Sequence, residues 1–179
     1  VRSNPYPYED EVIESVIQSI IEDIYSKEDK IKQLELKLSQ LNQETGYKLE
    51  TIPGVNTATA SKLISEIGDI NRFKNEKQLA KYCGIAPVSI GSASKNKEEA
   101  SLGGNRTLRA TFYFLAVGMV SANIHKEARQ PQFREYFLKK IQEGKTKQQA
   151  LICIMRQLVR IVFLMMKHRS EWQEPSTKR

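Results

Sequence analysis

Residues 9–45 limit the possible folds more than any other segment, because they contain neither glycine nor proline and would form a helix about 55 Å long. Apolar side chains recur along them in alternating steps of three and four residues, which is the spacing of a coiled-coil seam. Lys27 interrupts the seam and weakens it locally. One helix cannot bury a seam alone, so we expect it to pair with a second copy or with another helix. The apolar seam residues are Ile13, Ile17, Ile20, Ile24, Ile31, Leu34, Leu38 and Leu41.

The rest of the chain has helical spacing, and no segment shows the alternation of a strand, so the fold is predicted to be all-α. The helix that Asn105 begins is apolar nearly all round, which indicates a central buried helix. Capping residues and glycines mark the helix ends. We expect a flexible start at 1–8, a coiled-coil helix at 9–46, a compact helical domain at 47–169 and a flexible tail at 170–179. Within the domain, helices are expected inside residues 49–69, 75–84, 105–124, 131–144 and 146–168.

The charge of the chain favours a polyanionic partner. Its 28 lysine and arginine residues outnumber 21 acidic residues, which gives a net charge of +7 and a pI of about 9.4. Nucleic acid is the usual partner of a protein with this balance. A protein that is basic by chance is the alternative that composition leaves open.

Three further features narrow the setting. Cys83 and Cys153 lie in apolar helical patterns, which is typical of free thiols in a reducing compartment such as the cytoplasm. His125 and His168 stand apart from cysteines and from carboxylate clusters, so no metal site is expected in this chain. The longest apolar run, residues 110–122, is shorter than the roughly 20 residues that span a bilayer, and no membrane contact is expected.

Residues 52–63 match the helix-hairpin-helix pattern, in which a Pro-Gly turn is followed by an alanine and an apolar residue at fixed spacing. Asn56 stands at the second glycine position, and asparagine tolerates the left-handed conformation better than most residues. Such a hairpin presents backbone N–H groups and a helix N-terminus to a phosphate, without reading bases. A hairpin that only packs is the alternative. The motif is predicted at 49–68, with Pro53, Gly54, Val55, Asn56 and Thr57 as phosphate-binding candidates.

The segment between two predicted helices, residues 85–104, is called the serine loop here because it carries Ser89, Ser92, Ser94 and Ser101. A serine attacks a phosphodiester only when it is activated and when cations stabilise the phosphate oxygens. Glycines before the next helix leave its first N–H groups open to a phosphate. A passive surface loop is the alternative. The candidate phosphate ligands are Lys95, Lys97, Asn105, Arg106 and Arg109, and the two arginines share a helix face.

The order of short motifs along the chain resembles the C-terminal catalytic domain of a large class of bacterial insertion-sequence transposases, related to the pilin-gene invertase Piv and the MooV recombinases. The likeness runs from about residue 49 to residue 168, with the coiled coil before it. The motifs are Ile-Pro-Gly-Val at 52–55, Glu-Ile-Gly-Asp at 66–69, Arg-Phe at 72–73, Leu-Ala at 79–80, Tyr82, Gly-Ile-Ala-Pro at 84–87, Ser92, Gly-Asn at 104–105 and Leu-Arg at 108–109.

This resemblance implies a serine that attacks DNA and forms a covalent phosphoserine link. In the family the nucleophile usually lies five residues after the proline of the Gly-x-x-Pro element. That spacing indicates Ser92 as the first candidate, Ser94 as the second and Ser89 as the third. An alanine follows Ser92 where the family often has glycine, and Leu102 and Gly103 stand where the family has a basic pair.

The resemblance also implies a RuvC-like nuclease domain with a Mg²⁺-binding acidic tetrad, a guide RNA transcribed from the element's end, and a dimer or larger assembly. The acids of residues 9–50 fit the surface of the coiled coil, and the chain begins at Val1 without a methionine. We therefore expect the RuvC-like domain to be missing here, and this chain to bind no cofactor and to be inactive alone. The full-length protein is expected to be a bacterial DNA transposase or recombinase.

Two other functions remain open from the residues. One is a non-catalytic helix-hairpin-helix DNA-binding module that the coiled coil dimerises. The other is a coiled-coil scaffold whose charge has no partner.

Overall fold

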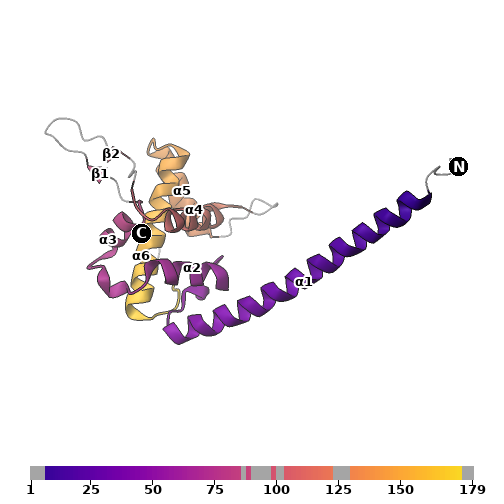
Figure 1. The fold of residues 1–179 in the computed structure, drawn as a ribbon. Coiled ribbons are helices and arrows are strands. Elements are labelled where there is room, and N and C mark those ends of the chain that lie inside the picture. Colours follow the sequence, from indigo (N-terminus) through magenta and orange to yellow (C-terminus); the bar gives the residue numbers. More distant parts are fainter. Residues whose placement is uncertain (1–6, 86–87, 90–97, 100–102, 123–129, 175–179) are drawn as a thin grey trace.

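The computed structural model describes residues 7–85, 88–89, 98–99, 103–122 and 130–174 (Figure 1). These ranges confirm an all-α fold with a long first helix and a compact helical body. One short antiparallel pair of two-residue strands is the only other regular structure in them. The elements are α1 (Pro7–Thr45), η1 (Leu49–Thr51), α2 (Thr57–Ile67), η2 (Ile70–Arg72), α3 (Glu76–Tyr82), β1 (Val88–Ser89), β2 (Glu98–Glu99), α4 (Arg106–Val120), α5 (Pro131–Gln142) and α6 (Lys147–His168), with η marking 3₁₀ helices.

Helix α1 is a projecting arm that touches the body only near its C-terminal end, where it packs against α2 (Figure 1). Asn42 anchors this end: its Nδ2 donates to Glu50 Oε1 at 2.8 Å, and Ser61 Oγ donates to its Oδ1 at 3.0 Å. The predicted seam is exposed from Ile13 to Leu34. No helix among the described residues covers this part of the seam.

Helix α6 is the centre of the compact body and contacts α3, α4, α5 and both 3₁₀ helices. Its buried stripe includes Ala150, Ile154, Leu158 and Met165, and Ile161 is half-buried. Among the described helices, α6 alone has the length and hydropathy to cross a membrane, but half of its apolar window is buried inside the body. A core helix meets the same criteria, so this finding is weak support for a membrane span.

Helix α4 is less enclosed than its composition predicts. Phe114 is 71% exposed and Tyr113 is 43% exposed, although Phe112 on the opposite side is fully buried. The reason is that α2, α5 and α6 cover only part of the surface of α4. The helix also ends at Val120, earlier than the expected end near residue 124, because Ser121 adopts an extended backbone conformation.

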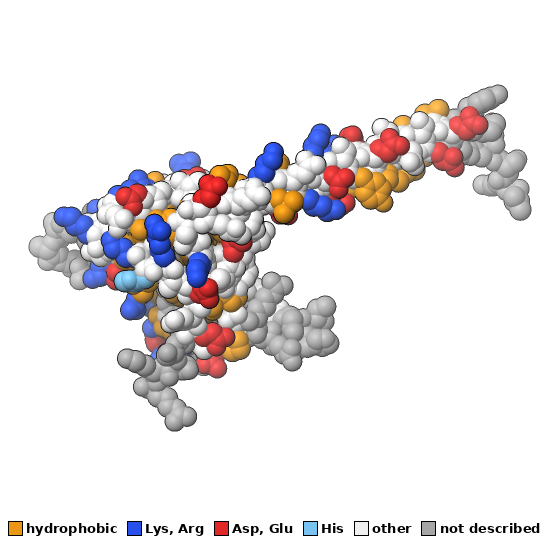
Figure 2. Space-filling model, turned by 90° about the horizontal axis from the view of Figure 1, so that it is seen from below, with side chains coloured by type: hydrophobic (Ala, Val, Ile, Leu, Met, Phe, Trp, Pro, Cys, Tyr) orange, Lys and Arg blue, Asp and Glu red, His pale blue; other side chains and the backbone are white. Residues whose placement is uncertain are grey.

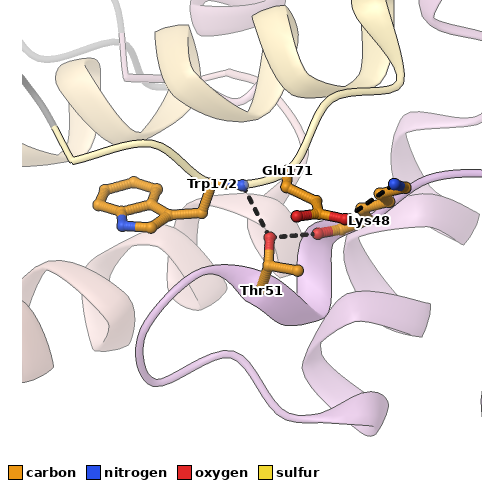
Figure 3. Close-up of polar contacts among 4 residues, drawn as sticks. All are labelled: Lys48, Thr51, Glu171 and Trp172. Carbon is orange, nitrogen blue, oxygen red and sulfur yellow. Dashed lines mark hydrogen bonds and ion pairs between the residues drawn. The ribbon is translucent and has the colours of Figure 1, made fainter.

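The first residues of the predicted flexible tail contact the body (Figure 3). The backbone N–H of Trp172 donates to Thr51 Oγ1 at 2.8 Å. Lys48 Nζ forms an ion pair with Glu171 Oε1 at 2.8 Å. The Trp172 ring also stacks on Phe133, with 6.2 Å between ring centroids. Residues 175–179 lie outside the described ranges.

Candidate nucleic-acid interface

The predicted hairpin begins with a tight turn. Val55 N–H donates to the Ile52 carbonyl at 3.0 Å, and Gly54 has a φ of 81°. Proline followed by a glycine with positive φ is the signature of a type II turn. Ile52 and Val55 are buried and anchor the turn, whereas Gly54 is exposed. The helix before the turn is only the three residues of η1, so the full helix-hairpin-helix geometry remains a prediction.

Asn56 does not adopt the left-handed conformation of the motif's second glycine, but it does cap the following helix. Its φ is −88°, so it is extended, and Gly54 supplies the left-handed residue of the hairpin. Asn56 caps α2: its side chain accepts from Thr59 N–H, and its carbonyl accepts from Ala60 N–H. Within the described part of the chain, the N–H group of Thr57 has no hydrogen-bond acceptor. A phosphate at the start of α2 would meet that group.

The serine loop is closed at its base by two glycines. A Cβ added to Gly104 would lie 2.6 Å from Gly84 N and 2.9 Å from the Tyr82 carbonyl oxygen. Both glycines have positive φ, 67° for Gly84 and 112° for Gly104. Arg156 Nε also donates to the Ile85 carbonyl at 3.3 Å. The two ends of the loop therefore meet backbone to backbone on the surface of α6.

Beyond this base the loop continues as a hairpin. Val88 pairs with Glu99, and Ser89 with Glu98, in antiparallel register. The third serine candidate, Ser89, therefore has its backbone in β1. The other loop candidates, Ser92, Ser94, Lys95 and Lys97, lie outside the described residues.

Helix α4 begins beside the loop base and carries the two predicted arginines. Asn105 caps it by accepting from the Leu108 N–H at 2.9 Å, as predicted. Arg106 is exposed and Arg109 is half-buried. The cap, the first turn of α4 and the base of the serine loop therefore lie together.

Asn105 lies in a cluster with four residues for which the sequence predicts no role: Glu66, Arg72, Phe73 and Tyr82. Asn105 Nδ2 donates to Glu66 Oε2 at 2.6 Å, and Asn105 N–H donates to the Tyr82 carbonyl at 2.8 Å. The Arg72 guanidinium stacks on the Tyr82 ring at 4.6 Å and on the Phe73 ring at 4.7 Å. Polar contacts from Asn105 first, and from Arg72 second, lower the pKa of the Tyr82 hydroxyl. These residues lie in the motifs at 66–69, 72–73 and 82, so the motif order was the sequence feature that could have indicated them.

The hairpin and the loop base lie at opposite ends of α2. Asn56 caps the first turn of α2, and Glu66 in its last turn holds Asn105. An 11-residue helix is about 16 Å long at 1.5 Å per residue. The structure thus joins the hairpin to the α4 start through one rigid helix but does not merge them into a single site.

The charge of the chain is divided between the arm and the body. Residues 9–26 include six acidic residues and no lysine or arginine, whereas residues 46–179 hold 23 basic and 11 acidic residues. Figure 2 shows lysine and arginine side chains gathered on the body, and acidic and hydrophobic ones toward the arm's tip. A polyanion would therefore be attracted to the body and repelled by the tip of the arm.

No group of three or more histidine, cysteine or carboxylate side chains within the described residues could hold a metal ion.

Comparison with known proteins gives a consistent family assignment. Residues 46–137 match the model of the transposase IS116/IS110/IS902 family. The chain is 34% identical over 147 residues to the pilin gene-inverting protein of Moraxella lacunata, covering 78% of this chain and 44% of that protein. It is 33% identical over 147 residues to the Moraxella bovis protein of that name, with the same coverage. It is 28% identical over 158 residues to a 43.6 kDa protein of insertion element IS110 in Streptomyces coelicolor, covering 87% of this chain and 37% of that protein. The chain thus spans less than half of the length of these relatives.

Proposed function

The chain belongs to the IS116/IS110/IS902 family of transposases, and from this premise we propose that it is part of an enzyme that recombines DNA by serine attack. The observation that supports the proposal most strongly is the closed base of the serine loop beside the Asn105-capped start of α4. In this proposal a serine of the loop reaches the helix N–H groups and Arg106, which lie beside the loop base. The name of the Moraxella relatives, which describes inversion of a gene, agrees with DNA recombination.

In the proposed reaction, the Ser92 hydroxyl attacks a DNA phosphodiester. A new bond forms between Ser92 Oγ and phosphorus, and one phosphorus–oxygen bond to deoxyribose breaks. The proton of the serine ends on the leaving deoxyribose oxygen, so the step is balanced without an oxidant or reductant. Lys95, Lys97, Arg106 and Arg109 stabilise the charge that develops on the non-bridging oxygens.

The hairpin at the other end of α2 binds the nucleic-acid backbone in this proposal. Helix α2 separates the hairpin from Glu66 by about 16 Å. This distance corresponds to about five base-pair steps of DNA at 3.4 Å per step. The hairpin and the α4 start can therefore contact the same duplex at different phosphates. Neither contact reads a base, so sequence choice comes from elsewhere in the complex.

The remaining parts of the complex follow from the family resemblance and are part of the proposal. A RuvC-like domain in the full-length protein supplies the Mg²⁺ site, a guide RNA selects the DNA, and the α1 seam joins two or more copies. In this proposal the Mg²⁺ would bind in that other domain. The protein acts on DNA in the bacterial cytoplasm, and this chain by itself cleaves nothing.

The test is a search for a protein-linked DNA adduct made by the full-length protein with its guide RNA. We expect an adduct in the wild type and a loss of at least about a thousandfold in the Ser92→Ala variant. Ser94→Ala and Ser89→Ala are the matched controls, because they remove the same hydroxyl from the same loop and should retain the adduct.

Each contrary result is informative. An unchanged adduct in Ser92→Ala, together with its loss in Ser94→Ala or Ser89→Ala, would move the nucleophile along the loop. Retention in all three variants would exclude serine catalysis by these candidates. DNA binding without any adduct would favour the non-catalytic DNA-binding module.

A further inference from the structure

Asn105 is held from three directions. Its side-chain oxygen accepts from the Leu108 N–H inside α4, its Nδ2 donates to Glu66 on α2, and its backbone N–H donates to the Tyr82 carbonyl at the end of α3. Glu66 lies 39 residues from Asn105 in the chain. The residue that begins α4 is therefore also the residue that connects α4 to two other elements.

The Glu66 contact determines which way the Asn105 amide faces. A carboxylate only accepts hydrogen bonds, so the NH₂ group of the asparagine must point toward it. The amide oxygen then faces the first turn of α4, where it caps the Leu108 N–H. With the amide reversed, Nδ2 would face another donor and the cap would be lost. The pairing is short, 2.6 Å, as expected when the acceptor carries a charge.

A stack of side chains holds the partners of Asn105 in place. The Arg72 guanidinium contacts the faces of both Phe73 and Tyr82, whose ring centroids are 5.4 Å apart. The Glu66 carbonyl lies 3.5 Å from both Arg72 and the Tyr82 hydroxyl, which is the outer limit of a hydrogen bond. This stack therefore ties the last turn of α2 to the end of α3, where the serine loop leaves the body.

We propose that Glu66 is a positioning residue that orients the Asn105 amide and so places the start of α4 against the base of the serine loop. The role in catalysis rests on the proposed function above. Glu66 does not touch DNA; it acts through Asn105, which presents the first N–H groups of α4 and Arg106 to the scissile phosphate. Removing the Glu66 carboxylate leaves α4 in place and loosens the first turn of α4.

The first experiment needs no activity. Hydrogen exchange of the Leu108 amide is measured by NMR in this chain, in Glu66→Ala and in Glu66→Gln. We expect exchange about five- to tenfold faster in Glu66→Ala, because the cap is no longer oriented. Glu66→Gln retains an acceptor oxygen and should stay within about twofold of the wild type.

Two further variants test specificity. Tyr82→Phe keeps the ring that stacks on Arg72 but removes the hydroxyl near Asn105. It should also speed exchange of the Leu108 amide, and it takes the place of Glu66→Ala in the test if Glu66→Ala fails to fold. Glu143→Ala removes a carboxylate that forms a hydrogen bond of the same 2.6 Å length, to Lys140 at the end of α5. That matched control should leave Leu108 exchange unchanged.

The second experiment measures adduct formation by the full-length protein at saturating DNA, well below the melting temperature. We expect Glu66→Ala to slow the reaction at least about tenfold, since misplacement by about 1 Å can cost up to a hundredfold. DNA affinity should change by less than about threefold, and Glu66→Gln should restore the rate. A residue that merely stabilised the fold would change the fraction folded without separating rate from affinity.

The two experiments separate this proposal from the proposed function. Wild-type Leu108 exchange in Glu66→Ala and Tyr82→Phe would overturn the orienting role whatever the activity. Altered exchange with an unchanged adduct rate would overturn the role in the reaction. An absent adduct in the wild type would overturn the proposed function, and with it the catalytic role, while the exchange measurement would still decide whether Glu66 orients Asn105.

Discussion

At the scale of single residues, close backbone contact at the loop base requires glycine. Gly84 and Gly104 approach so closely that neither position has room for a Cβ, and both have positive φ. An alanine at either position would have to move backbone atoms rather than the end of a flexible side chain. Even a methyl side chain at either position would therefore disturb the backbone contact that closes the serine loop.

We expect Gly104→Ala to lower the free energy of unfolding by at least about 2 kcal/mol, because strained φ adds to a backbone clash. Gly144→Ala is the matched control: its φ is 88°, but nothing lies within 4 Å of the added Cβ. It should cost only about 1 kcal/mol. Chemical denaturation of both variants checks the difference, and equal losses would show that the clash at the loop base is relieved without cost.

Cys83 should react slowly with alkylating agents in the folded chain. Burial raises the pKa of the Cys83 thiol to about 12, so almost none of it is thiolate at pH 8. We expect iodoacetamide to alkylate Cys83 about a thousandfold more slowly in the native chain than in urea. Mass spectrometry of the Cys83 peptide measures the rate, with Cys83→Ser as the assignment control. Equal rates in native and unfolded protein would contradict the buried placement.

At the scale of elements, helix α2 links both parts of the candidate interface. Its first turn is capped by Asn56 next to the hairpin, and its last turn holds Asn105 through Glu66. Helix α2 has only 11 residues, so a displacement of its first turn reaches its last turn over about 16 Å. The Asn56 cap stabilises the first turn of α2, and the Glu66 contact connects its last turn to the start of α4.

Asn56→Ala should destabilise the chain by about 1 kcal/mol through loss of the cap. It should also weaken DNA binding, because the hairpin N–H groups are then held less firmly. Thr146→Ala is the matched control, since Thr146 forms the capping box of α6 away from the hairpin. That variant should lose similar stability and keep its DNA affinity. Equal affinities for the two variants would make the hairpin a packing element only.

At the scale of the whole molecule, the arm and the body differ in surface chemistry. The seam of α1 is uncovered along most of its length, and the charge of the chain is basic on the body and acidic at the arm's tip. Exposed apolar side chains in such a row are a common mark of association between chains. The body holds its own core around α6 and does not need the arm for burial.

Replacing Ile20 and Ile24 by glutamate should lower the mass found by sedimentation equilibrium toward that of one chain. The melting temperature of the body should change by no more than about 2 °C, because neither residue is buried in the chain. Gln18→Glu with Ser19→Glu adds the same charge away from the seam and should keep the larger mass. A monomeric wild type would refute self-association through the seam of α1.

Local features of the sequence were sufficient to predict much of this protein. Caps at Asn75, Asn105 and Thr146 were predictable because each uses a side chain and an N–H group three residues later. The heptad spacing predicted α1 because this pattern is also local, repeating every three or four residues. Motif order also identified the serine loop and the arginines that follow it as a candidate site.

Only the tertiary structure decided which distant residues meet. Glu66 and Asn105, Gly84 and Gly104, and Trp172 with Thr51 are separated by many residues, so no local rule links them. The exposure of Phe114 on an apolar helix likewise depends on how much of α4 its neighbours cover. Local hydrogen bonding and periodicity determine the elements, whereas contacts between them depend on the packing of the entire body around α6.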